Sequence, residues 1–359
     1  MEERRRQHAA IARIGLIPER AVEVLGAALN LIPTPVPQAL FAPPTARVLQ
    51  VGVAVGLFER LARGGPARGD DLARELDLQP AGTRLLCECL AAMGHLRVSR
   101  DGRYRLSRRS RPWLDPASPR SVTQFIAHTA TYWPWWEQLE ALIRDGTHVE
   151  LHGAGPQDPS WERYIRGQYE LARFSAPEVA KALELPPGAR SVLDVAGAHG
   201  FFAAALCDRH PQLRATVVDL PGSSAVGRAI MAETGHDDRV THVDGSAFEV
   251  PLGGPHDAAL VFNLVHHLDP ASTVTLLRRV HAALAPGGTL AVLDLVGRTG
   301  HAKPGGEAFL GLFFHLTSGA DVPTDAGLRR YIAEAGFQPP RAVGLKRIPA
   351  QTLYLARRA

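Results

Sequence analysis

The second half of the chain alternates short apolar runs with longer segments in which apolar residues recur every three or four positions. The runs at 191–195, 215–219, 240–243, 258–263 and 289–295 predict strands, and the segments between them predict helices. Two further runs, at 341–346 and 352–356, predict a terminal strand pair. Since strands that alternate with helices build a parallel sheet covered on both faces, we expect a doubly wound α/β domain with a mostly parallel seven-stranded sheet.

The first half of the chain has a mostly helical pattern. Residues 1–40 predict one or two helices that end in the proline-rich segment 32–37, and residues 44–63 predict one buried helix. Short helices at 70–76 and 80–94 precede two strands, 96–99 and 103–106, which flank the hairpin signal Asp101-Gly102. Two short helices followed by a hairpin predict a winged helix.

Together these patterns predict four parts. They are an N-terminal helical arm at 1–40, a winged-helix domain at 41–120, a helical linker at 121–185 that is interrupted by a loop at 144–160, and the sheet domain at 186–359. A chain of 359 residues is too long for one ordinary hydrophobic core, which agrees with at least two domains.

Composition and charge narrow the class of protein. The chain is 45% hydrophobic and 21% charged, and its net charge of +4 is too small to indicate nucleic-acid binding by itself. Cys87, Cys89 and Cys207 cannot form a disulfide framework and lack the spacing of a zinc site. No signal peptide is evident, and the apolar run at 48–58 is too short to span a bilayer. We therefore expect a reduced, cytoplasmic protein without a metal site or a membrane segment.

A small-residue turn follows the first strand of the sheet domain. The sequence Asp194-Val-Ala-Gly-Ala-His-Gly200 runs from the strand into a predicted helix, and the next strand ends on Asp219. Such a turn lets the backbone approach a ligand closely, and an acid after the second strand can bind ribose hydroxyls. The spacing fits a nucleoside cofactor, either NAD or S-adenosylmethionine.

Three further features resemble class I S-adenosylmethionine-dependent methyltransferases, and more closely the small-molecule O-methyltransferases of plant phenylpropanoid and bacterial polyketide type. The segment Val218-Asp-Leu-Pro221 is similar to the family's D-L-P, and Val265-His-His-Leu-Asp269 is similar to its L-H-D-W. The winged-helix region at 46–113 resembles the family's dimerisation domain. The resemblance covers about residues 45–357 and implies a homodimer whose Rossmann-like domain binds S-adenosylmethionine.

The resemblance also implies a cofactor site, with two departures. Alanines 196 and 198 stand where the family has glycines, and Gly245-Ser-Ala-Phe248 stands where it has G-D-F-F. An alanine permits the close approach unless its position requires a positive φ. The cofactor residues carried over from the family are Asp194, Gly197, Gly200, Asp219, Leu220, Ser246, Ala247, Phe248 and Asn263.

The catalytic residues implied by the resemblance follow the fourth strand. His266 aligns with the family's general base, its neighbour His267 is the alternative base, and Asp294 stands where an acid orients the base. Val322 occupies the place of a second acid, and an acid, Asp321, stands one residue early. A metal site through His267 and Asp269 lacks a third ligand, and Asp269 is better explained as a helix N-cap.

The function that this resemblance implies is methyl transfer to a hydroxyl of an aromatic or polyketide-like small molecule in secondary metabolism, such as antibiotic biosynthesis. Aromatic residues of the segments 132–136 and 309–315 provide either an acceptor wall or ordinary core, and Pro304-Gly-Gly306 could let the second segment move as a lid. The substrate candidates are Trp133, Trp136, Phe313 and His315.

Two other functions remain open at the level of sequence. A relative of the same fold could perform C-methylation, hydroxylation, decarboxylation or rearrangement on such a substrate. A non-catalytic winged-helix regulator is the alternative of another class, because arginines 97, 100, 103, 105, 108, 109 and 111 gather on the predicted wing. However, the helix that would read DNA is mostly apolar and suits a dimer interface, so we expect no nucleic-acid partner.

Overall fold

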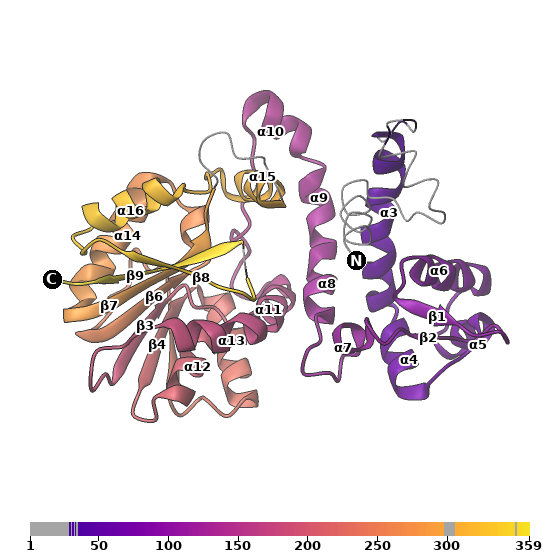
Figure 1. Ribbon diagram of the computed structural model, residues 1–359, viewed down its shortest axis with the longest axis horizontal. Helices are drawn as coiled ribbons and strands as arrows, with labels where there is room; N and C mark the ends of the chain where they lie inside the picture. The colour runs from indigo at the N-terminus through magenta and orange to yellow at the C-terminus, as the bar shows by residue number, and fades with distance from the viewer. Residues whose placement is uncertain (1–28, 30, 32, 34, 298–305, 349) are drawn as a thin grey trace. The chain divides into compact units, whose positions relative to one another are not determined.

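The computed structural model describes residues 29, 31, 33, 35–297, 306–348 and 350–359, and the chain divides into two compact units, Met1–Ala130 and Thr131–Ala359 (Figure 1). Most of the expected N-terminal arm lies outside the described residues. Each unit has its own hydrophobic core.

The first unit has the helices and hairpin of a winged helix. Its described elements are α3 (Pro35–Ala54), α4 (Leu57–Gly64), α5 (Gly69–Glu75), α6 (Pro80–Ala92), β1 (Leu96–Val98), β2 (Tyr104–Leu106), α7 (Arg111–Leu114) and α8 (Thr123–Thr129). Strands β1 and β2 pair antiparallel around the predicted turn. Leu57, Phe58, Leu72, Leu90 and Leu96 fill the core, which confirms the winged-helix prediction.

The prediction of one helix over 44–63 is wrong. The segment forms α3 and α4, which are separated at Gly56, where φ is 72°. Glycine adopts this left-handed conformation without steric cost, so the backbone turns there although the apolar pattern continues. Helix α3 also begins at Pro35, inside the proline-rich segment that was expected to end a helix, since proline is favourable in a first turn.

Among the described residues, no single helix is both long and apolar enough to cross a membrane. Only α3 and α4 together reach that length and hydropathy, and they are bent by 57° at their junction.

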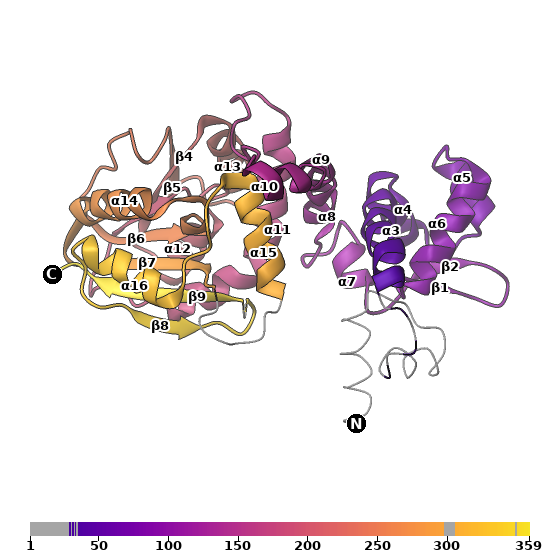
Figure 2. The same cartoon turned by 90° about the horizontal axis from the view of Figure 1, so that it is seen from above.

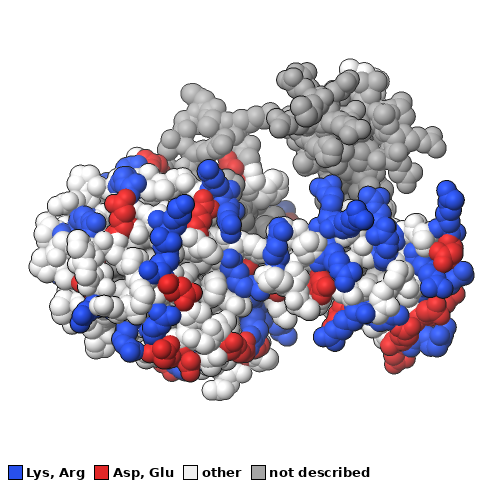
Figure 3. Space-filling view, turned by 60° about the horizontal axis from the view of Figure 1, so that its bottom comes forward, with Lys and Arg blue, Asp and Glu red and all other residues white. Residues whose placement is uncertain are grey.

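The arginines of the predicted wing lie on its surface. All of its arginines are exposed: Arg97, Arg100, Arg103, Arg105, Arg108, Arg109 and Arg111. In the view of Figure 3, basic and acidic side chains are interspersed on the surface rather than separated into fields of one sign.

The second unit begins with helices and continues into the sheet. Its leading elements are η1 (Ala130–Tyr132), α9 (Trp133–Trp136), α10 (Leu139–Asp145) and α11 (Ser160–Ala182). The strands are β3 (Ser191–Val195), β4 (Arg214–Asp219), β5 (Val240–Asp244), β6 (His256–Phe262), β7 (Leu284–Leu295), β8 (Arg341–Gly344) and β9 (Gln351–Arg357). They form one sheet in the order β5-β4-β3-β6-β7-β9-β8, with five parallel strands and an antiparallel pair at one end.

Strand β7 starts earlier than its expected bounds of 289–295. Leu284 already pairs with His256, and the register shifts between His256 and Ala258 before regular pairing resumes at Thr289. The Pro-Gly-Gly turn therefore lies inside the strand as an irregularity instead of preceding it.

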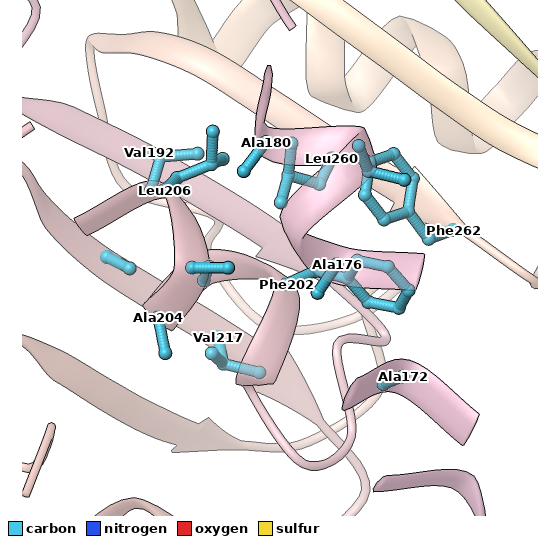
Figure 4. Packing of buried hydrophobic residues seen from close by; sticks show 14 of the residues in the cluster. Ala172, Ala176, Ala180, Val192, Phe202, Ala204, Leu206, Val217, Leu260 and Phe262 are labelled. Atoms are coloured by element: carbon cyan, nitrogen blue, oxygen red, sulfur yellow. The ribbon is translucent and has the colours of Figure 1, made fainter. Parts of the chain in front are cut away.

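Helices cover both faces of this sheet, as Figures 1 and 2 show. Helices α11, α12 (Phe201–Arg209) and α13 (Pro221–Glu233) pack on one face, and α14 (Pro270–Ala283) and α16 (Asp325–Glu334) pack on the other. Successive residues of β6 alternate between the faces, Leu260 and Phe262 toward the first and Val261 toward the second. Small residues of α11 and α12, such as Ala176 and Ala204, let these helices lie close to the sheet (Figure 4). The doubly wound fold is confirmed.

The order of the strands also determines where a ligand can bind. From β3 the chain crosses through α12 to β4 on one side, and from β6 it crosses through α14 to β7 on the other. The carboxyl ends of β3 and β6 therefore flank the point where the winding direction reverses, which is the usual ligand site of such sheets. Both the small-residue turn and His266 follow these two strand ends.

Candidate functional site

The small-residue turn after β3 has a left-handed backbone at three positions. The φ angles are 53° at Ala196, 46° at Ala198 and 70° at Gly200. Ala196 and Ala198 therefore have a positive φ, which glycine adopts freely and alanine adopts only with steric strain. An alanine in this region costs about 1–2 kcal/mol of conformational energy, and contacts with the surrounding structure must offset that cost.

Hydrogen bonds on both sides hold Ala198 in this conformation. Its backbone N–H donates to Oδ2 of Asp219 at 2.7 Å, and its carbonyl oxygen accepts from Nε2 of His242 at 2.9 Å. Gly227 leaves room for this contact, because a Cβ there would lie 2.3 Å from that carbonyl oxygen and 2.4 Å from His242 Nε2. His242 was not expected at the site, since it points from β5 and has no local sequence signal.

Asp194, at the end of β3, is a buried acid with an unsatisfied oxygen. Its Oδ2 has no hydrogen-bond partner among the described residues, and burial followed by the charge of Asp219 raises its pKa to about 8. Gly197 lies directly against it, since a Cβ there would be 2.4 Å from the carboxyl carbon. An unpaired buried carboxyl is costly unless a donor or a cation joins it. The ammonium group of S-adenosylmethionine would satisfy it, so these residues fit the cofactor.

Asp219, at the end of β4, joins the turn to the following helix. Besides Ala198, it accepts a hydrogen bond from the backbone N–H of Leu220, the N-cap of α13, at 2.7 Å. Burial raises its pKa, and these two backbone donors oppose that rise. Each carboxyl oxygen can accept a further bond, so the acid remains able to receive ribose hydroxyls.

The other expected cofactor residues lie after β5 and β6. Ser246 and Ala247 are half-buried and Phe248 is exposed, and Arg279 donates to the carbonyl oxygen of Ala247 at 2.9 Å, which ties this segment to α14. Asn263 is exposed, has a φ of 53°, and bonds through its side chain to Gln351. These positions surround the same sheet edge as the turn.

His266 and Asp294 form a close buried pair. Nδ1 of the ring lies 2.5 Å from Oδ1 of the acid, and both residues are buried. The same carboxylate accepts backbone N–H groups from Val265 at 2.8 Å and Leu295 at 2.7 Å. Because the carboxylate faces only donors, the ring N–H is on Nδ1 and Nε2 is left as an acceptor. Nε2 has no partner among the described residues and is not sealed from solvent.

His267 lies beside this pair in η2 (Val265–His267), with ring centroids 4.2 Å apart. Its Nδ1 is 2.7 Å from the hydroxyl of Ser318, in α15 (Gly306–Ser318). Burial, with the neighbouring imidazoles of His266 and His152, lowers its pKa well below the ordinary value. His267 is therefore held neutral beside the expected base.

His152 and Tyr164 complete this cluster, and the sequence did not indicate either of them. The His152 ring meets that of His267 edge-on at 5.0 Å, and its Nε2 lies 3.4 Å from the Tyr164 hydroxyl. Burial lowers the pKa of His152 to about 4 and raises that of Tyr164. His152 lies in the loop before α11, where no periodic pattern identifies it.

The aromatic segments meet within the second unit. The rings of Tyr132 and Trp136 lie 4.7 Å and 5.6 Å from that of Phe313, and Phe314 packs on His266 at 3.8 Å. Phe313 is largely buried in this cluster, which favours a core role for that ring. Trp133 is half-buried.

Two further predicted positions, His315 and Asp269, interact with partners other than the two histidines. His315 is partly exposed, with Nδ1 3.1 Å from the carboxylate of the exposed Asp321. Asp269 is the N-cap of α14 and accepts from Ala271 and Ser272, as predicted. The described residues contain no group of three or more acids, histidines or cysteines placed to bind a metal ion. Most of the proposed lid segment, 304–306, lies outside the described residues.

Comparison with known proteins gives two matching domain families. An O-methyltransferase domain matches residues 136–338, and an O-methyltransferase dimerisation domain matches residues 41–116. The first match spans more than half of the chain and includes both the turn and the histidines.

Individual O-methyltransferases are similar to this chain over most of its length. Acetylserotonin O-methyltransferase of Mus musculus is 30% identical over 81% of this chain and 80% of its own length. The tetracenomycin polyketide synthesis 8-O-methyl transferase of Streptomyces glaucescens is 29% identical over 84% and 90%. The solved structure of the mitomycin 7-O-methyltransferase MmcR superposes with a TM-score of 0.79 at 26% identity, covering 93% of this chain and 99% of that one.

The resemblance seen in the sequence is therefore confirmed, and it extends over both units. This chain belongs to the S-adenosylmethionine-dependent O-methyltransferases.

Proposed function

We propose that this enzyme methylates a hydroxyl group of an aromatic or polyketide-like small molecule in secondary metabolism, with His266 as general base. The observation that carries the proposal is the buried pair of His266 and Asp294 beside the cofactor turn of an O-methyltransferase fold. Relatives named for tetracenomycin and mitomycin chemistry support an aromatic acceptor of this kind.

The turn after β3 would hold the cofactor. Asp194 would face the ammonium group of its methionine portion, Asp219 the ribose hydroxyls, and the segment 246–248 the adenine. When bound, S-adenosylmethionine supplies an electrophilic methyl group on a positively charged sulfur.

His266 supplies the proton transfer. Asp294 keeps hydrogen on Nδ1, so Nε2 can accept the proton of an acceptor hydroxyl as that oxygen becomes nucleophilic. Asp294 then stabilises the resulting imidazolium. The acid is one methylene shorter than the family's glutamate, yet the short Nδ1–Oδ1 distance shows that it reaches the ring.

Val322 stands in the place of the family's second supporting acid, and Asp321, one residue earlier, is exposed and pairs with His315. Among the described residues, Asp294 is the carboxylate that bonds to the ring of His266. An acceptor with an acidic phenol, which needs little help in losing its proton, suits this reduced arrangement.

We also propose that the enzyme is a homodimer through its first unit, which matches an O-methyltransferase dimerisation domain. Exposed apolar side chains of α3, such as Val36, Leu40 and Phe41, agree with a partner on that unit. Size-exclusion chromatography with light scattering tests this, and a monomer at micromolar concentration contradicts it.

The activity test uses S-adenosylmethionine with a panel of phenolic and polyketide acceptors, followed by product mass. A gain of one methylene unit, located on oxygen by NMR, supports the proposal. A methyl group on carbon, an unchanged mass or an oxygenated product contradicts it.

A further inference from the structure

The hydroxyl of Ser318 lies between two hydrogen-bond partners, the carbonyl oxygen of Phe314 at 2.9 Å and Nδ1 of His267 at 2.7 Å. The carbonyl can only accept, so we assign the hydroxyl hydrogen to it. With this assignment the Ser318 oxygen accepts from His267, the ring N–H of His267 is on Nδ1, and Nε2 is an acceptor.

His267 thus repeats the arrangement of His266. Each ring donates from Nδ1 to a fixed oxygen, on Ser318 or Asp294, and keeps Nε2 as an acceptor. Neither Nε2 has a partner among the described residues, and neither is enclosed away from solvent. Two adjacent rings, with centroids 4.2 Å apart, therefore offer two acceptors and no donor at Nε2.

The surroundings of His267 keep this acceptor unprotonated. His152 contacts its ring edge-on at 5.0 Å, Phe314 contacts it at 5.3 Å, and the His266 ring lies on it. Among these neighbours there is no carboxylate, in contrast to His266, so a positive charge on His267 has no partner. The lowered pKa of both His152 and His267 agrees with neutral rings.

We propose that His267 determines substrate specificity by accepting a hydrogen bond from a second hydroxyl of the acceptor, next to the one that is methylated. The inference rests on the proposed function, because His266 must take the first hydroxyl's proton. His266 then acts as the base, because Asp294 stabilises the protonated ring. His267 has no such carboxylate and acts only as a hydrogen-bond acceptor.

The contact between the two rings, whose centroids lie 4.2 Å apart, is the basis on which we choose the substrate class. Hydroxyls on neighbouring carbons are the closest pair that an aromatic ring can carry, so a vicinal dihydroxyarene is the class that suits acceptors on two rings in contact. A hydroxyl replaced by hydrogen or methoxy leaves Nε2 of His267 without a donor, and an unmade bond in a desolvated site reduces transition-state binding.

The test compares kcat/KM for a vicinal dihydroxyarene, its meta and para isomers and the monohydroxyarene. His267→Phe keeps an aromatic ring and removes the acceptor. We expect the wild-type enzyme to favour the vicinal isomer, and the variant to lose about three- to tenfold of that preference, which is the effect of one hydrogen bond. Its affinity for S-adenosylhomocysteine, measured by calorimetry, should match the wild type, which checks that the variant is folded with an intact cofactor site.

Two further variants separate this role from packing. Ser318→Ala leaves the imidazole in place but frees its tautomer, and should lower the same preference by a smaller factor. His281→Phe is the matched control, because His281 also packs edge-on to a phenylalanine, Phe337 at 4.9 Å, in α14 outside the site. It should leave the preference unchanged.

The outcomes distinguish the two proposals. Methyl transfer with a preference that is unchanged in His267→Phe, or with a wild-type preference for the meta or para isomer, overturns the role of His267 alone. Absence of methyl transfer to oxygen in every acceptor overturns the proposed function and this inference with it.

Discussion

The turn after β3 and the histidine pair after β6 lie at neighbouring strand ends but are built in opposite ways. The turn holds two alanines in a left-handed conformation and contains a buried carboxyl with an unpaired oxygen. At the pair, both oxygens of Asp294 have donors, and Nε2 of His266, the proposed proton acceptor, is left open.

In the proposed function, this difference corresponds to the difference between binding and catalysis. An unpaired buried acid would gain a partner when a cationic ligand binds, so the turn would contribute affinity that is realised only on binding. The histidine pair is already arranged, so it would contribute orientation without further rearrangement. Substitutions at the two places should therefore change different quantities.

The largest expected effect is on the histidine side. His266→Ala should lower kcat by about 10²–10⁴, the usual contribution of a general base. Its affinity for S-adenosylhomocysteine, measured by calorimetry, should match the wild type, and the His281→Phe control should keep full kcat. A kcat close to the wild-type value would move the role of base to His267 or leave positioning alone to drive the reaction.

On the cofactor side, Asp219→Ala should weaken S-adenosylhomocysteine binding by about ten- to a hundredfold, the effect of losing hydrogen bonds to a charged group. The variant also frees the backbone N–H of Ala198. Asp219→Asn is the matched variant, because it keeps the size of the side chain while removing its charge. Unchanged affinity in both variants would refute the ribose assignment.

A smaller effect is the release of a proton from Asp194 when the cofactor binds. With a pKa of about 8, this carboxyl is mostly protonated at pH 7, and an ammonium group beside it should release up to about one proton on binding. Calorimetric titrations of S-adenosylhomocysteine in buffers of different ionisation enthalpy measure that release. Asp194→Asn should abolish it, and a proton release that persists in this variant contradicts the assignment.

The same acid gives a stability prediction. Its pKa is raised from 3.8 to about 8 on folding, so the folded protein without cofactor binds this proton more tightly than the unfolded chain does. Its contribution to the free energy of unfolding therefore decreases as pH rises from about 4 to 8. Asp194→Asn should remove this decrease in urea titrations across that range, and an unchanged slope would contradict it.

The smallest effect is the strain of the turn. Ala198→Gly should raise the free energy of unfolding by about 0.5–1 kcal/mol, since the relief of the left-handed alanine is partly offset by the greater freedom of glycine in the unfolded chain. If His242 holds the strained carbonyl, His242→Ala should cost less stability when combined with Ala198→Gly. Additive effects in this double-mutant cycle would show that the two residues act independently.

Much of this architecture follows from local patterns. Apolar runs predicted the strands of the sheet. The acids at the ends of β3 and β4 indicated where a nucleoside cofactor would bind. The spacing around Val265–Asp269 indicated His266, and its contact with Asp294 followed the family resemblance. Periodic apolar residues and motifs at strand ends involve residues that are close together in the chain. They can therefore be recognised in the sequence without information on distant contacts.

Predictions from the sequence were wrong or missing where the structure depends on contacts between distant residues. The apolar pattern of 44–63 continues through Gly56, and only the packing of α4 shows that the backbone turns there. His152 has no motif, because its role depends on a loop that reaches His267 across more than a hundred positions.

The sequence by itself determined the order of elements, the cofactor-binding edge of the sheet and the base candidate, because periodicity and turn chemistry act between near neighbours. Tertiary structure alone decided which conformation Ala196 and Ala198 adopt, which partner His267 Nδ1 has and which rings surround His267. Those properties depend on His242, Ser318 and His152, side chains that folding brings together from separate parts of the chain.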